Sequence, residues 1–178
     1  MKSIAAIVLL SCCALAQDTA AISAAEAGCG PQDKHFEVAS DESQHPAPPP
    51  EEGKAVIYFI ADGHPTSVFG VDGKWVGAVN GGRYFFVSIE PGEHHLCARR
   101  QNSVQPGTRT GFRDTGPRVS VHSLKAQAGG SYYFRTRMLQ IIDRPGGIGF
   151  VFQLDQMDSD EGRWFVAWSK FSTSHPKD

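Results

Sequence analysis

Several features that would assign this chain to a functional class are missing from its sequence. No apolar run reaches the roughly 18 residues that a membrane-spanning helix requires. Seventeen basic residues against 19 acidic ones give a net charge of −2, so no global excess of positive charge indicates a nucleic-acid partner. The motifs G-x-S-x-G and H-E-x-x-H and the phosphate-binding loop do not occur. The hydrolases, zinc proteases and nucleotide-binding proteins that carry these motifs are therefore disfavoured.

What the chain does contain favours one β-rich domain. Its 178 residues suit a single domain with additional processing or linker sequence, and 40% hydrophobic residues are enough to form a core. The 19 Gly and 11 Pro exceed the usual share of these residues. Because both residues mark turns, this excess favours short strands over a helical bundle.

The N-terminus has the pattern of a secretory signal peptide. One positive charge precedes the apolar segment Ile4–Leu10, and the small residues Ala14 and Ala16 stand at the −3 and −1 positions before Gln17. Cleavage between Ala16 and Gln17 makes residues 1–16 a signal peptide. The rest of the chain is then exported to the periplasm or the extracellular space.

A second interpretation of the same segment stays open. Leu9-Leu10-Ser11-Cys12 resembles the lipoprotein motif of bacteria, in which Cys12 carries lipid and becomes the mature N-terminus. Both interpretations export the protein, and the second anchors it to the envelope. A third interpretation leaves the segment uncleaved and buried.

Processing after Ala16 removes two of the four cysteines and leaves Cys29 and Cys97. An even number of cysteines in an exported chain predicts one disulfide between them. Closing this 68-residue separation contributes roughly 4 kcal/mol in the chain-entropy model. The alternative is two unpaired thiols, whereas metal binding by the two cysteines alone is disfavoured because neither belongs to a C-x-x-C pair.

Residues 17–52 differ in composition from the rest of the chain. The start is rich in Ala and Ser, His35–Val38 predicts a short edge strand, and Pro46–Glu52 contains four prolines. Consecutive prolines favour the polyproline II conformation and cannot enter the interior of a sheet. We therefore expect an N-terminal segment that ends in a proline-rich spacer, with a proline-rich ligand for another domain as the alternative.

Residues 53–178 form the predicted domain. The run Ala55–Ala61 is apolar at all seven positions and predicts a strand buried on both faces. Asp72-Gly73 between two apolar runs predicts a hairpin with a type I′ turn. Further strands are expected at 67–71, 74–79, 83–89, 94–99, 118–126, 131–139 and 148–154.

One helix is expected near the C-terminus, over about Ser159–Ser169. Trp164, Ala167, Trp168 and Phe171 recur at helical spacing and predict the face that packs on a sheet. The side chains of Asp158 and Glu161 resemble a capping box at its start. The tail after residue 171 is polar and should be extended.

These elements predict a mainly β fold, an antiparallel β-sandwich of about eight strands with one C-terminal helix. The turns are too short for parallel crossovers. Strands that are apolar on both faces need a second layer to cover them.

Four segments resemble a known bacterial family. They are Gly53–Ile60, Val71–Gly77, Tyr84–Ala98 and Ala128–Arg135. Their rhythm is similar to PEGA-type surface modules and closer to the domain of unknown function 2846, found in predicted exported and lipid-anchored proteins. This resemblance implies a β-sandwich-like domain at the cell envelope, with no enzymatic activity assigned to it.

The histidines and arginines supply the remaining candidates for a site. The adjacent His94 and His95 should point to opposite faces of a strand, so they cannot share one metal. His95 and Cys97 do share a face and form a metal-binding pair if His35 or His122 comes near. The alternative is a histidine of the core or sheet surface beside a disulfide cysteine.

A basic loop at 101–117 with its flanks is the expected binding surface. The arginines that it offers are Arg99, Arg100, Arg109 and Arg113. An anionic envelope polymer or a lipid headgroup is the partner that this charge favours, and a solvated loop without a partner is the alternative. An envelope protein is the other partner expected of an exported module.

The sequence therefore predicts an exported, non-enzymatic binding or structural module of the bacterial cell envelope, without catalytic residues, resident metal or cofactor. Peripheral or lipid-anchored attachment to the membrane is compatible with it. The first alternative is a metal-binding or thiol-dependent protein centred on His95 and Cys97. The second is an outer-membrane lipoprotein anchored through Cys12.

Overall fold

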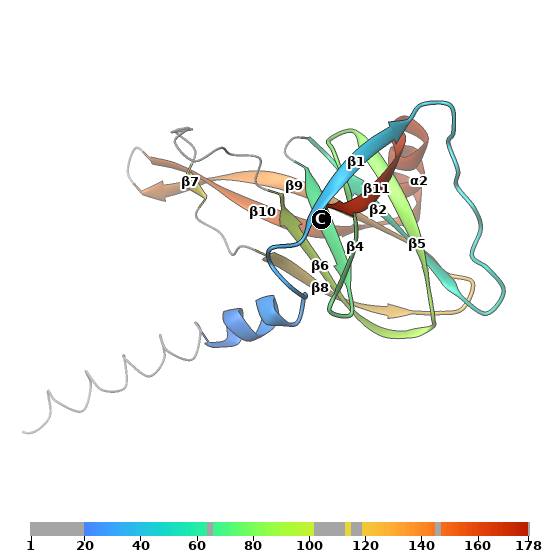
Figure 1. Ribbon diagram of the computed structural model, residues 1–178, viewed down its shortest axis with the longest axis horizontal. Helices are drawn as coiled ribbons and strands as arrows, with labels where there is room; N and C mark the ends of the chain where they lie inside the picture. Colours follow the sequence, from blue (N-terminus) through green and yellow to red (C-terminus); the bar gives the residue numbers. More distant parts are fainter. Residues whose placement is uncertain (1–19, 64–65, 102–112, 115–118, 145–146, 178) are drawn as a thin grey trace, which may run out of the picture.

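The computed structural model describes residues 20–63, 66–101, 113–114, 119–144 and 147–177, which form two β-sheets and two helical segments (Figure 1). The described part holds eleven strands against the expected eight or so: the edge strand expected at 35–38 is present as β1, and β7 and a strand from the C-terminal tail were not expected. It also holds a second helical segment, at residues 20–27, so the expectation of a single helix is wrong. None of the described helices is long and apolar enough to span a membrane.

The larger sheet has seven strands and the smaller has four. In spatial order the larger contains β1 (His35–Asp41), β11 (Lys170–Lys177), β5 (Arg83–Ile89), β2 (Ala55–Ala61), β9 (Ser131–Arg144), β10 (Gly147–Met157) and β7 (Arg113–Asp114). The smaller contains β4 (Lys74–Val79), β3 (Ser67–Val71), β6 (Gly92–Arg100) and β8 (Val119–Ala126). One apolar core draws on strands of both sheets, which therefore cover each other's inner faces.

The larger sheet is mixed, which corrects the expectation of a wholly antiparallel fold. β2 pairs in parallel with β9, β5 with β11, and β10 with β7, whereas every pair in the smaller sheet is antiparallel. β2 and β9 are separated in sequence by the six strands β3 to β8. This long connection returns the chain to the same end of the sheet, so a parallel pair needs no local crossover helix.

The central strand β2 is buried at every position, as its sequence predicts. Ile57 and Phe59 belong to the core between the sheets, and Tyr58 and Ile60 belong to a second cluster on the outer face. A strand that is apolar on both faces therefore needs two covers, and the second one is made by α2 (Ser159–Trp168) and by the proline segment.

The turn and the helix cap that the sequence predicts are both present. Asp72 and Gly73 have φ angles of 50° and 77°, the left-handed pair that a type I′ turn needs. The carboxylate of Asp158 accepts hydrogen bonds from the backbone N–H groups of Asp160 and Glu161, at 2.9 and 2.8 Å, and so caps α2.

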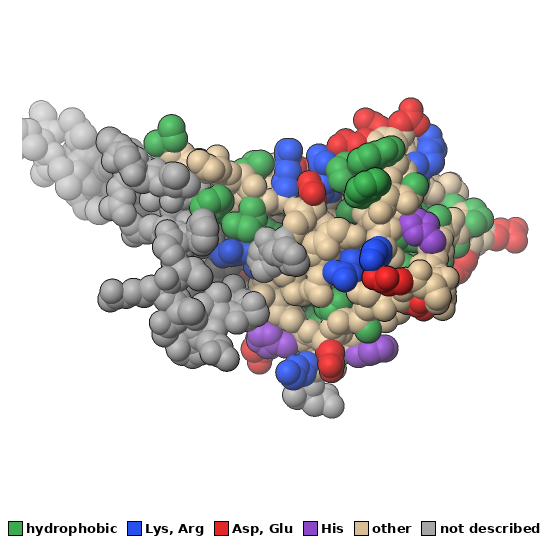
Figure 2. Space-filling view, turned by 90° about the horizontal axis from the view of Figure 1, so that it is seen from above, with side chains coloured by type: hydrophobic (Ala, Val, Ile, Leu, Met, Phe, Trp, Pro, Cys, Tyr) green, Lys and Arg blue, Asp and Glu red, His purple; other side chains and the backbone are tan. Residues whose placement is uncertain are grey.

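The face of α2 that packs on the sheet is not the one that the tryptophans predicted. Trp164 and Trp168 are 58% and 76% exposed, and the buried residues are Gly162 and Val166. Gly162 leaves no space for a Cβ against the Tyr133 ring, so only a glycine permits this close approach of helix and strand. The two tryptophan rings instead stack on each other in solvent, with centroids 5.9 Å apart. Seen from above, hydrophobic side chains protrude beside acidic and basic ones toward the end of the molecule at which α2 lies (Figure 2).

β1 and β11 complete one side of the larger sheet. The expected edge strand at 35–38 extends to Asp41 and pairs along its length with β11, which forms from the tail despite Pro176. Residues 35–41 therefore belong to the sheet and not to a spacer.

Candidate functional site

The outer face of the larger sheet carries a cluster of buried tyrosines. Tyr58, Tyr84 and Tyr133 lie there among aliphatic side chains, and Val166 of α2 packs on them. The Tyr58 and Tyr133 rings are stacked, with centroids 5.1 Å apart and planes 12° from parallel. Because these positions come from three neighbouring strands of one sheet, the rings form a continuous aromatic floor.

Residues 46–50, which we call the proline strap, cross this floor. The hydroxyl of Tyr58 donates to the Pro48 carbonyl at 2.7 Å, and the hydroxyl of Tyr84 donates to the Pro46 carbonyl at 2.9 Å. The His45 ring meets Tyr84 edge-on at 5.3 Å. Prolines have no N–H to offer a sheet, but their carbonyls accept hydrogen bonds, so the segment docks on side chains instead. The expectation of a simple spacer is wrong here.

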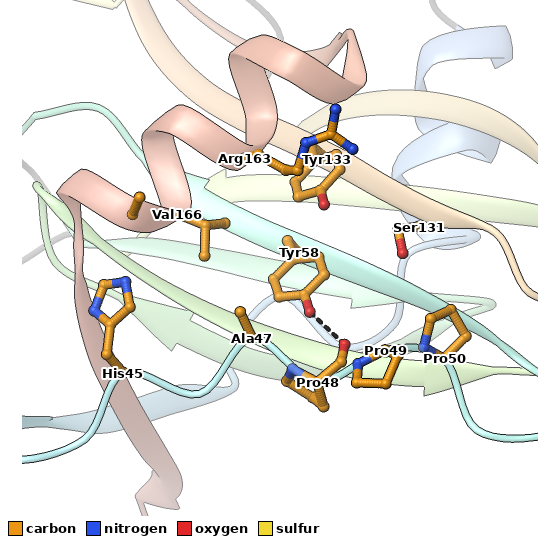
Figure 3. A pocket seen from close by; sticks show the side chains of 11 residues that line it. His45, Ala47, Pro48, Pro49, Pro50, Tyr58, Ser131, Tyr133, Arg163 and Val166 are labelled. Carbon is orange, nitrogen blue, oxygen red and sulfur yellow. Dashed lines mark hydrogen bonds between the residues drawn. The ribbon is translucent and has the colours of Figure 1, made fainter.

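A pocket opens between the proline strap and α2 (Figure 3). Its volume is about 480 Å³, within the range of small-molecule sites. The lining residues are His45, Ala47, Pro48, Pro49, Pro50, Tyr58, Ser131, Tyr133, Arg163, Val166 and Ala167. Apolar walls with a few polar groups are typical of a binding site for a small molecule.

The polar side chains of the pocket are His45, Tyr58, Ser131, Tyr133 and the cationic Arg163. Burial raises the pKa of Tyr58 to about 12 and raises that of Tyr133 as well; it also raises to about 12 the pKa of Tyr84, which holds the proline strap outside the pocket lining. These phenols therefore stay protonated at neutral pH and cannot serve as bases. Arg163, which is ion-paired with Asp160 on the helix surface, lies beside Tyr133 at the mouth of the pocket (Figure 3).

A second group of chemically active side chains lies on the outer face of the smaller sheet. Cys29 and Cys97 form a disulfide with Cα atoms 5.8 Å apart, as the cysteine count predicted. The Nε2 atom of His95 lies 3.8 Å from the Cys29 sulfur, so a histidine and two sulfurs converge. His95 and Cys97 share a face of β6, as expected.

The third member of this group is Cys29, not one of the histidines proposed from the sequence. The His122 ring packs edge-on against Phe134 of the core, with centroids 5.0 Å apart, on the opposite face of the smaller sheet. His35 lies exposed at the start of β1. Spacing along one strand identified the pair, but only the tertiary fold brings Cys29 to it.

A solvent-accessible hollow of about 500 Å³ adjoins His95, lined also by Asp72, Glu93, His94, Ser123, Leu124 and Lys125. The Nδ1 of His94 lies 2.7 Å from an Asp72 carboxylate oxygen, and its Nε2 lies 2.8 Å from the Glu90 carbonyl. Burial opposes the charged form of His94, but these hydrogen bonds and the Asp72 charge outweigh it and raise the pKa of His94. Burial likewise opposes ionisation of Asp72, yet its hydrogen bonds with His94 and His95 keep the pKa of Asp72 lowered.

The structure removes Arg99 from the arginine surface that the sequence predicts. Arg99 is only 6% exposed, stacks on Trp75 at 4.9 Å and donates to the backbone carbonyls of Lys34 and Arg100. It therefore holds the N-terminal segment against β6 and is not available to a polymer, and Arg100 is half-buried at the strand end.

The remaining expected site residues are not tested. Arg113 lies in the two-residue strand β7. Arg109, Cys12, Ala16 and Gln17 lie outside the described residues.

Comparisons with protein-family models, curated proteins and solved structures give no match to this chain.

Proposed function

We propose that this protein is an exported, non-enzymatic β-sandwich module of the bacterial cell envelope, of the domain of unknown function 2846 type. We further propose that it binds a small ligand between the proline strap and α2. The observation that carries the proposal is the pocket itself. It combines a stacked tyrosine floor, proline walls and one arginine at its mouth.

The lining indicates the chemistry of the ligand. Tyr58 and Tyr133 line the pocket and give it aromatic contacts, which favour a ligand with an aromatic ring. Arg163 at the mouth favours an anionic group on the same ligand, because a guanidinium donates to carboxylates and related anions. A planar ring that bears an acidic group fits both features.

The same lining supports a binding role over catalysis. Figure 3 places His45 and Ser131 at opposite ends of the pocket, so they do not form a nucleophile and base pair. The phenols are proton donors with a raised pKa. Among the described lining residues, this leaves groups that orient a ligand but do not activate it.

Export is supported by the signal-peptide pattern before Gln17 and by the disulfide, which is typical of oxidising compartments. The mass of the mature N-terminus tests it. A chain that begins at Gln17 supports simple export, and an acylated chain that begins at Cys12 supports the lipoprotein alternative. An intact Met1 in cytosolic material would contradict both.

The binding site is tested with 1-anilinonaphthalene-8-sulfonate, which joins flat aromatic rings to an anionic group. Ala167→Phe places a ring in the pocket from the exposed side of α2 and should abolish the fluorescence gain. Arg163→Gln should weaken binding several-fold by removing the cation. The matched control is Lys170→Gln, which removes another ion-paired surface cation and should leave binding unchanged. Equal binding by all three variants would contradict the assignment of the pocket.

A further inference from the structure

The group of Cys29, His95 and Cys97 lies apart from the strap pocket, on the outer face of the other sheet. One ligand atom from each residue, two sulfurs and one imidazole nitrogen, lies within 4.8 Å of the others. Thiolate sulfur and imidazole nitrogen are the donors that zinc prefers in proteins. We propose that the reduced chain binds one zinc ion through these three residues, and that the disulfide is the closed, metal-free state of the same site.

Opening the site requires a reductant. A dithiol reduces the disulfide by exchange: its two thiols become a disulfide, and Cys29 and Cys97 each gain a hydrogen and become thiols. The zinc ion then binds both sulfurs as thiolates, and the two thiol protons are released to solvent. Electrons and protons balance, and the only partner needed besides the metal is the dithiol.

The geometry favours zinc once the sulfur–sulfur bond is broken. Two sulfurs that are no longer bonded must move apart to van der Waals contact. Zinc–sulfur bonds of about 2.3 Å at a tetrahedral angle hold two thiolates at a similar separation. The Nε2 atom of His95 already lies 3.8 Å from the Cys29 sulfur, close to the sulfur–nitrogen edge of such a tetrahedron. Reduction therefore moves the sulfurs toward the positions that the ion requires.

The surroundings provide a route and a support for the third ligand. His95 lines the solvent-accessible hollow of about 500 Å³, whereas both cysteines are buried, so an ion reaches the sulfurs from the histidine side. A carboxylate oxygen of Asp72 accepts a hydrogen bond from the backbone N–H of His95 at 2.9 Å and fixes this part of β6. Three protein ligands beside a hollow leave the fourth position of the ion open to water.

The experiment uses the processed chain in two redox states. One sample stays oxidised; the other is reduced with dithiothreitol and desalted without oxygen, and both are titrated with zinc sulfate under native mass spectrometry. We expect one zinc ion per reduced chain and none per oxidised chain. His95→Ala should weaken zinc binding at least tenfold, while His122→Ala, on the opposite face of the sheet, should not change it.

Each other outcome overturns the proposal. A reduced chain that takes up no zinc, or one that binds it equally with His95→Ala, has no such site. Zinc bound with equal affinity by the oxidised chain would place the metal elsewhere. If reduction unfolds the chain, near-ultraviolet circular dichroism decides: zinc should restore the native signal, and an unfolded reduced chain that stays unfolded with zinc contradicts the site.

Discussion

The two sheets of this molecule cover their outer faces in different ways. On the smaller sheet, the N-terminal segment is held by the Cys29–Cys97 disulfide and by the Arg99 guanidinium, which donates to the Lys34 carbonyl. On the larger sheet, the proline strap is held by two tyrosine hydroxyls and leaves a pocket beside α2.

This difference separates a covalent attachment from one made of hydrogen bonds. A disulfide resists opening until it is reduced, whereas a hydrogen bond contributes about 1 kcal/mol and opens by thermal motion. We expect the disulfide-held face to contribute more stability and the strap-held face to respond more readily to a ligand.

The largest expected effect is the loss of the disulfide. Cys29→Ala combined with Cys97→Ala should lower the free energy of unfolding by about 4 kcal/mol, because the 68-residue separation is no longer closed in the unfolded chain. Urea unfolding of the processed protein measures it. Reduction of the wild type should produce a similar loss, and an unchanged midpoint in both would show that the attachment contributes little.

The next effect distinguishes the buried and exposed sides of α2. Val166→Ala should cost about 2 kcal/mol, since Val166 packs on the tyrosine cluster. Trp168→Ala removes a much larger side chain but should change stability by less than about 0.5 kcal/mol, because Trp168 lies in solvent. If thermal unfolding ranks these variants in reverse, the tryptophan face is the packed one.

Removing one strap contact should have a smaller effect. Tyr58→Phe deletes the hydroxyl that donates to Pro48 and should cost about 1 kcal/mol. Protease cleavage within the strap should also become faster. Tyr132→Phe is the control, because its hydroxyl accepts from the exposed Gln127 N–H and not from the strap, and it should leave the rate of strap cleavage unchanged.

The smallest effect is a pH dependence at the contact between His94 and the Asp72 turn of the smaller sheet. The pKa of His94 is raised and that of Asp72 is lowered. Their pairing therefore stabilises the fold at pH values above the pKa of Asp72 and below the pKa of His94. The contribution is lost as pH rises through the raised pKa of His94, and also as pH falls through the lowered pKa of Asp72. It should stay below about 1 kcal/mol, since Asp72 is half exposed.

His94→Gln tests this dependence. The difference in unfolding free energy between wild type and variant should be largest at mildly acidic pH and should shrink in alkaline buffer. A difference that does not vary with pH would mean that the charge of His94 is unimportant.

Local sequence rules predicted the elements better than their contacts. The Asp72-Gly73 turn, the Asp158 cap and the two-sided burial of β2 follow from residues close in sequence, and all three are present. The tryptophan face was wrong because helical spacing finds an apolar stripe but not its partner. Gly162, with no side chain, gave no sign that it would be the contact with Tyr133.

For the candidate sites too, the sequence predicted local neighbours but not contacts between distant segments. The pair of His95 and Cys97 was visible as neighbours on one strand, and the cysteine count linked Cys97 to Cys29. The strap pocket was missed, although Tyr58 in the middle of an apolar strand was a signal, because a buried hydroxyl needs an acceptor. Nothing near Tyr58 in the sequence indicates that this acceptor is the Pro48 carbonyl.

The amino-acid sequence alone determined where the chain turns, which segments extend and which strand is buried on both sides, because these depend on backbone conformations and apolar patterns within a few residues. The tertiary structure alone decided which face of α2 is covered, where the proline strap docks and which histidine meets the sulfurs. These features depend on packing between surfaces that lie far apart in the chain. The energy of that packing arises only once the two sheets have assembled.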